Sequence, residues 1–125
     1  MLFAQILSND TVACNFYQDT LYALGSDLSP MQADDSHDTV AAIGFPFTFY
    51  GNVYNYLVIS GNGYVTFDLT QATLYSPWAI NAAIPNPGIL PENAIMSPWH
   101  DINTGLGGQV YFGMSGIAPN RFFII

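Results

Sequence analysis

Aspartate residues gather in one short segment of this chain and could bind a cation. Asp34, Asp35 and Asp38 lie in the segment ADDSHD, and Asp101 and Asn103 lie together much further along. Ca²⁺ takes about six to eight oxygen ligands and tolerates irregular loops, so these residues form a candidate calcium site. The D-x-[DN]-x-[DN]-G spacing of an EF-hand is absent. The alternative interpretation is a solvated acidic loop that keeps the protein soluble.

Other metal-binding patterns are weaker. His37 and His100 lie far apart in the chain, without the spacing or the cysteine partner of a zinc site. Each is therefore expected to be a surface or hydrogen-bonded histidine. Cys14 is the single cysteine. It is either a small core residue or, in an exported protein, one half of a disulfide with a cysteine outside this sequence.

Catalytic patterns are also thin. Ser60-Gly61-Asn62-Gly63 lacks the Gly-x-Ser-x-Gly order of a nucleophile elbow, and its glycines are better explained by a hairpin turn than by a phosphate-binding loop. Glu92 and Asp101 could act as the paired carboxylates of a glycoside hydrolase, but nothing in the sequence places them in a shared cleft. No pair of nucleophile and base can be assembled, so the sequence predicts a protein that is not an enzyme.

Two aromatic residues are candidates for ligand contact. Tyr75 and Trp78 lie in the long, proline-rich irregular stretch 69–93, and such loops often carry contact residues. Aromatic rings offer a large contact area at low entropic cost to sugar rings or protein partners. The alternative is that Trp78 plugs the end of the core, since tryptophan is highly buried on average.

A β-meander is predicted to position these residues. Aromatic and β-branched residues dominate stretches 43–50, 53–60 and 64–67, which are separated by turns at Gly51-Asn52 and Gly61-Asn62-Gly63. Alternation in the first stretch predicts one buried face. The rings expected to line the inside of two stacked sheets are those of Phe45, Phe47, Phe49 and Phe67.

The rest of the chain extends the same fold class. Further strands are predicted near 94–99, 109–113 and 121–125, with loops over 26–38 and 114–119. The expectation is an all-β fold, an antiparallel, jelly-roll-like β-sandwich of about seven or eight short strands. Residues 5–125 would form one domain, incomplete at its C-terminus because the chain ends on an apolar strand. Residues 1–4 have the character of a signal-peptide remnant, with an N-terminal strand as the alternative.

Composition excludes several partners. Half of the residues are hydrophobic, only 8% are charged, and the net charge is −8, with Arg121 as the one basic residue. Such a chain cannot neutralise a phosphate backbone, so nucleic acid is excluded as a partner, and anionic membrane surfaces are disfavoured. No stretch approaches the roughly 20 apolar residues that span a bilayer, so no membrane insertion is expected.

Three blocks carry a family resemblance: IGFPFTFYGNVYNYLVISGNGYVTFD, ENAIMSPWHDIN and GGQVYFGMSGIAPNRFFII. Together they resemble the nidogen-like β-sandwich domain of Bacteroidota surface proteins, which are gliding-motility or adhesin-like proteins exported by the type IX secretion system. The resemblance covers about residues 40–125. It implies a secreted or cell-surface module of a larger parent polypeptide, without catalysis, that binds a protein or glycan ligand.

The resemblance also bears on individual residues. Many members have paired acids after the aromatic residue of the second block, where this chain has Trp99-His100-Asp101, and the histidine weakens the case for a metal. Members continue past the third block with strands that often contain cysteines, which implies a partner for Cys14. Two alternative functions stay open, a carbohydrate-active enzyme domain or accessory module, and a structural spacer.

Overall fold

The described part of the chain is entirely β apart from two short 3₁₀ turns. The computed structural model describes residues 29–31, 34–84, 86–89, 91–96 and 98–125, which form seven strands in two antiparallel sheets. This confirms the predicted all-β, antiparallel sandwich class. The predictions for residues 1–4 and for Cys14 lie outside the described residues.

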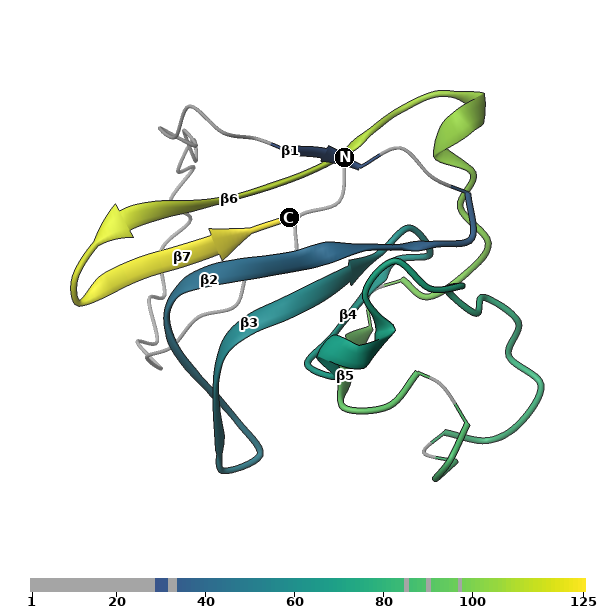
Figure 1. The fold of residues 1–125 in the computed structure, drawn as a ribbon, viewed down its shortest axis with the longest axis horizontal. Helices are drawn as coiled ribbons and strands as arrows, with labels where there is room; N and C mark the ends of the chain where they lie inside the picture. Colours follow the sequence, from purple (N-terminus) through teal and green to yellow (C-terminus); the bar gives the residue numbers. More distant parts are fainter. Residues whose placement is uncertain (1–28, 32–33, 85, 90, 97) are drawn as a thin grey trace, which may run out of the picture.

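The larger sheet contains the predicted meander. Its strands are β2 (His37–Phe49), β3 (Asn52–Ser60), β4 (Tyr64–Thr66) and β5 (Ala94–Met96), in the order β2-β3-β4-β5 (Figure 1). β2 begins earlier than predicted, since His37 already pairs with Ser60 at the far end of β3. The prediction of a loop up to residue 38 was wrong there, because pairing with β3 outweighs the polar composition of the segment.

The smaller sheet has the order β1-β6-β7 and comprises β1 (Ser29–Met31), β6 (Val110–Ile117) and β7 (Asn120–Ile124). β1 falls within the stretch predicted as a loop, and β6 continues to Ile117 through residues that were also predicted as a loop. The physical reason is the ladder with β7, which pairs Gly113 through Ile117 residue by residue and tolerates the small side chains there.

Two 3₁₀ turns, η1 (Leu69–Gln71) and η2 (Thr104–Leu106), complete the described elements. In each, a side chain caps the turn: Asp68 accepts from the Thr70 backbone N–H, and Asn103 accepts from that of Gly105. Within the described ranges, no helix has the length and hydropathy of a membrane-spanning segment.

The core lies between the two sheets and centres on buried side chains from β2, β3, β4 and β7. Its members are Ala41, Ile43, Leu57, Ile59, Val65, Phe67 and Phe123. Phe67 is buried as predicted, whereas Phe45, Phe47 and Phe49 are only partly buried and pack against this cluster.

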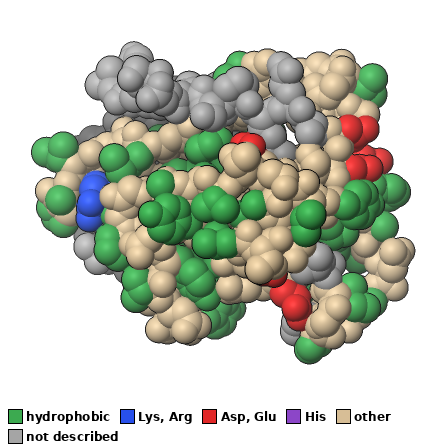
Figure 2. Space-filling model, viewed as in Figure 1, with side chains coloured by type: hydrophobic (Ala, Val, Ile, Leu, Met, Phe, Trp, Pro, Cys, Tyr) green, Lys and Arg blue, Asp and Glu red, His purple; other side chains and the backbone are tan. Residues whose placement is uncertain are grey.

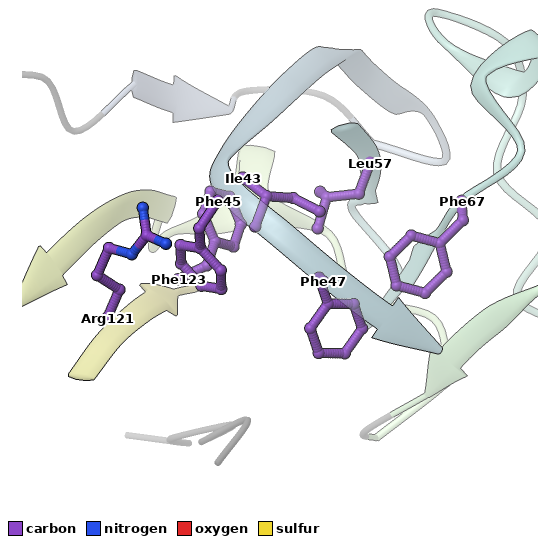
Figure 3. Close-up of a pocket in the computed structure, with 7 residues that line it drawn as sticks. All are labelled: Ile43, Phe45, Phe47, Leu57, Phe67, Arg121 and Phe123. Atoms are coloured by element: carbon purple, nitrogen blue, oxygen red, sulfur yellow. The ribbon is translucent and has the colours of Figure 1, made fainter. Parts of the chain in front are cut away.

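An irregularity in β2 explains the partial burial of these three rings. Between Ala42 and Phe47 the register of β2 against β3 shifts, and Gly44 takes a positive φ of 82°. Extra residues in one strand break the strict alternation of side chains between the two faces. Two of the rings, those of Phe45 and Phe47, border an apolar gap beside Phe123, at whose edge Arg121 lies over Phe45 (Figure 3).

Candidate ligand-binding surface

Asn62, in the turn between β3 and β4, ties three loops together. Its side chain is fully buried, with 0% exposure. The Nδ2 group donates to Asp35 Oδ1 and to the Ser76 carbonyl, each at 3.0 Å, and Oδ1 accepts from the Ile102 backbone N–H at 3.0 Å. The Asn62 carbonyl accepts from the His100 N–H at 3.3 Å. A buried amide whose polar atoms are all bonded fixes its neighbours firmly.

Gly63 allows the segment around Pro98 to approach this turn. Its φ is +81°, and a Cβ at this position would lie 2.0 Å from the Pro98 carbonyl oxygen. Only glycine avoids both the clash and the strain of positive φ. The spacing of Gly61, Asn62 and Gly63 thus serves close packing as well as the hairpin turn.

A buried polar network lies beside Asn62. The Tyr64 hydroxyl is hydrogen-bonded to His37 Nε2 at 2.8 Å and accepts from Ser76 Oγ at 3.2 Å. Ser60 Oγ lies 2.5 Å from Ser76 Oγ and accepts from the Asn62 N–H. Burial lowers the pKa of His37 and raises the pKa of Tyr64. These groups bond to one another and hold the loop at Ser76 in place.

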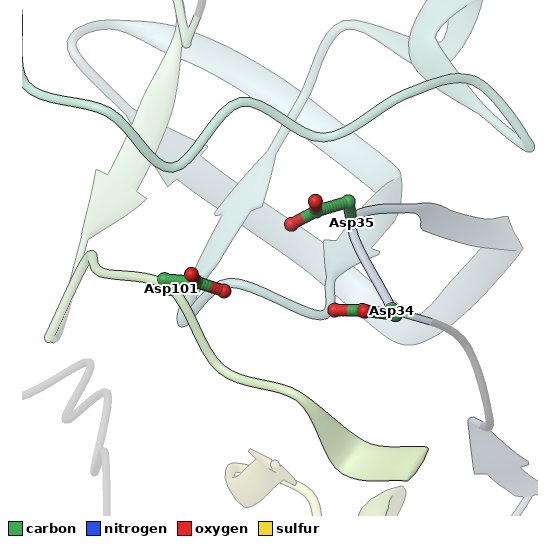
Figure 4. Close-up of side chains that lie close together, drawn as sticks. All are labelled: Asp34, Asp35 and Asp101. Carbon is green, nitrogen blue, oxygen red and sulfur yellow. The ribbon is translucent and has the colours of Figure 1, made fainter.

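Three of the four predicted calcium ligands meet at the surface next to this network. Oxygens of Asp34, Asp35 and Asp101 lie within 4.8 Å of one another (Figure 4). Asn103, the fifth candidate, lies beside the acids but turns its Nδ2 toward them: it donates to Asp34 Oδ2 at 2.7 Å, whereas its Oδ1 accepts from the Gly105 N–H. Asp38 does not join them, since its Oδ1 accepts locally from the Thr39 N–H at 2.7 Å.

The three neighbouring carboxylates could together bind a cation. Like charges this close repel one another, and a bound cation would relieve the repulsion. Within the described residues, Asp34 and Asp101 are exposed and Asp35 is half-buried. Calcium binding stays a prediction, because exposed acidic groups are common without a metal.

The two predicted contact residues lie beside these acids. Trp78 Nε1 donates to Asp35 Oδ2 at 3.2 Å, and 37% of Trp78 is exposed. Tyr75, 62% exposed, forms an isolated β-bridge with Ser36, directly after Asp35. Trp78 is therefore no buried plug of the core. We call the surface formed by Asp34, Asp35, Tyr75, Trp78 and Asp101 the acid–aromatic surface.

The remaining candidates stay apart from this surface or support it. Glu92 accepts from the Gly88 N–H and is not among the acids gathered around Asp101. His100 is exposed, with Nδ1 2.9 Å from the Asp101 carbonyl oxygen. Trp99 Nε1 donates to the Pro77 carbonyl at 2.8 Å and so anchors the loop that carries Trp78.

Sequence reasoning missed the residues that assemble the surface. The hydrogen bonds between the loops are made by Asn62, Ser76 and Trp99. Each of these residue types is common in turns or at strand ends, so none of them stands out in the sequence. The one available signal was an asparagine between two glycines, a pattern that permits another backbone to approach closely.

Comparison with protein families gives one match. A family model described as NIDO related matches residues 11–125, which includes every described residue. Comparisons with curated proteins and with solved structures gave no match.

Proposed function

The chain belongs to the NIDO-related family, and on that premise we propose that it is a non-catalytic, extracellular module of a larger surface protein. The likeness of its three sequence blocks to Bacteroidota surface proteins supports an adhesin-like parent exported by type IX secretion. Its partner is a protein or glycan ligand outside the cell.

The observation that carries the binding proposal is the hydrogen bond between Trp78 and Asp35. It joins the predicted aromatic contact residues to the predicted acidic residues on one surface. Trp78 remains 37% exposed, so part of its side chain is accessible for contact. Aromatic rings and fixed carboxylates are complementary to sugar hydroxyls, C–H faces and donor groups of proteins. Loops held on a rigid sheet commonly carry such sites.

Non-catalysis is proposed because the described serine and histidine side chains that lie close enough to form a nucleophile–base pair are bonded to one another in the interior. His37, Ser60 and Ser76 are buried and bonded to one another or to Tyr64. A catalytic group must reach a substrate within hydrogen-bond distance. Release of reducing sugar from a bound glycan would contradict this part of the proposal.

The binding test uses an array of extracellular-matrix proteins and glycans, followed by titration of the strongest ligand. We expect Trp78→Ala and Tyr75→Ala each to weaken binding about tenfold or more, as truncation of an aromatic contact does. Tyr111→Ala is the matched control, because Tyr111 is an exposed aromatic on β6. No ligand on the array, or binding that is unchanged in Trp78→Ala, would overturn the proposal.

The location is tested separately. In intact cells of the source, added protease should digest the module without lysis if it lies at the cell surface or is secreted. Protection until lysis would contradict an extracellular position.

A further inference from the structure

The hairpin between β2 and β3 ends in a tyrosine that is held in an unfavourable conformation. Tyr50 and Gly51 connect Phe49 to Asn52, and both have positive φ, 46° and 81°. This is the arrangement of a type I′ turn, in which asparagine, aspartate or glycine is preferred at both positions. Positive φ is an outlier for a bulky side chain and costs free energy.

Packing does not account for the choice of tyrosine at this position. The Tyr50 ring contacts the Phe49 ring edge-on at 4.7 Å, yet Tyr50 remains 90% exposed. A side chain that is strained, apolar in its body and almost entirely in solvent gains little from the fold. Such an outlier is a reason to ask what the ring does outside the fold.

The sequence on both sides of Tyr50 is uncharged over a long stretch. Residues 39–67 contain no acidic or basic side chain, although the net charge of the protein is −8. On the face that Figure 2 shows, the acidic side chains drawn in red lie away from this end of the hairpin. We call the exposed residues of this end the hairpin tip: Thr48, Tyr50, Asn52, Val53, Asn55 and Tyr56.

We propose that the hairpin tip is a second binding site and that its ligand is a neutral carbohydrate whose ring stacks on Tyr50. Aromatic rings supply the stacking face, and the amides of Asn52 and Asn55 and the hydroxyl of Thr48 can bond to sugar hydroxyls. This site lies at the opposite end of β3 from Asn62, roughly 25 Å away for a strand of this length.

Charge and composition select this ligand class. Acidic sugars would meet a protein of net charge −8 with no basic group at the tip, since Arg121 lies over Phe45. The six residues that define the tip offer no carboxylate to a basic ligand. A protein partner favours tryptophan, tyrosine, arginine and a contiguous apolar centre; the tip has two tyrosines and one valine among polar residues, without tryptophan or arginine, so binding of a protein is the competing outcome that the test includes.

The test probes the full chain on an array of neutral gluco-, manno-, galacto- and N-acetylglucosamine oligosaccharides, with uronic and sialylated oligosaccharides and matrix proteins alongside. The strongest neutral binder is then titrated by calorimetry against Tyr50→Asn. Asparagine tolerates positive φ, so the melting temperature should stay equal or rise while affinity falls about tenfold or more. This variant separates loss of binding from loss of folding.

Tyr111→Asn, the same substitution at an exposed tyrosine on β6 outside both surfaces, is the matched control. Neutral-glycan affinity lost in Tyr50→Asn and kept in Tyr111→Asn supports the second site. Affinity that is unchanged in Tyr50→Asn overturns it, and a loss confined to Tyr75→Asn assigns binding to the acid–aromatic surface instead. Binding only of acidic glycans, only of proteins, or of nothing on the array also overturns it.

Discussion

Two turns at opposite ends of β3 contain the same dipeptide and have opposite roles. The hairpin with β2 closes at Tyr50-Gly51, and Asn52, which follows as the first residue of β3, is exposed. Gly61-Asn62 leads into β4, and Asn62 is fully buried among three loops. The first turn leaves Tyr50 in solvent, whereas the second organises the acid–aromatic surface. The same Gly-Asn sequence can therefore serve two purposes. The segments that pack against the turn decide whether it stabilises the fold or remains exposed to solvent.

The largest difference in stability between the two turns is expected when their glycines are replaced. Gly63→Ala should destabilise the fold by about 4 kcal/mol, because its Cβ would meet the Pro98 backbone and its φ is positive. Gly51→Ala has the same φ but open space around it, so the cost should be about 1 kcal/mol. Urea unfolding of both variants measures the difference. Equal losses would break the comparison.

The asparagines give the next largest contrast. Asn62→Ala removes three side-chain hydrogen bonds and leaves buried partners unpaired, so we expect a loss of about 3 kcal/mol. Asn52→Ala should stay within about 0.5 kcal/mol of the parent protein, as surface substitutions usually do. Chemical denaturation is again the measurement, and a loss below 1 kcal/mol in Asn62→Ala would refute the role of Asn62 as a tie between loops.

The strands were largely predictable from the sequence, because glycine turns between β-rich runs are local signals. The β2–β3–β4 meander and the buried Phe67 followed from such signals. The start of β2 at His37 and the strand β1 did not, since both depend on pairing with distant residues. The burial of Phe45 through Phe49 was overestimated because the irregularity in β2 leaves no clear mark in the alternation.

The site could be predicted in part. The acids and aromatics were identified by residue type, and the structure brings Asp34, Asp35 and Asp101 together while leaving Asp38 aside. Their assembly depends on Asn62, which bonds residues 27 and 40 positions away in the chain. Contacts at such separation follow from the fold and cannot be seen in a local pattern.

Calcium would distinguish the two turns, because it should bind only at the acid–aromatic surface beside Asn62. Added at about ten times its dissociation constant, Ca²⁺ should stabilise the fold by about 1.4 kcal/mol and raise the melting temperature, with reversal by EDTA. Asp34→Asn should abolish the shift, whereas Asp38→Asn should retain it, because Asp38 is not among the three gathered acids. A melting temperature insensitive to calcium would dispose of the metal site.

The smallest expected effect is that of acid on stability, and it should arise at the end of β3 where Asn62 lies. Burial holds the pKa of His37 below its ordinary value of 6.5, so the unfolded chain binds the proton more readily. Stability should therefore fall as the pH drops from about 6.5 toward the lower folded-state pKa. His37→Gln should flatten this dependence between pH 7 and pH 5. The lowered pKa of Asp68 acts below 3.8, outside that window. An unchanged slope in His37→Gln would contradict this assignment.

Native-state hydrogen exchange tests most directly whether Asn62 holds the loops of the acid–aromatic surface. The backbone N–H groups of His100 and Ile102 bond to Asn62, whereas Tyr50 and Gly51 form the exposed turn at the other end of β3. We predict slow exchange at His100 and Ile102, fast exchange at Tyr50 and Gly51, and loss of the protection in Asn62→Ala. Exchange at Ile102 as fast as at Gly51 would contradict the account.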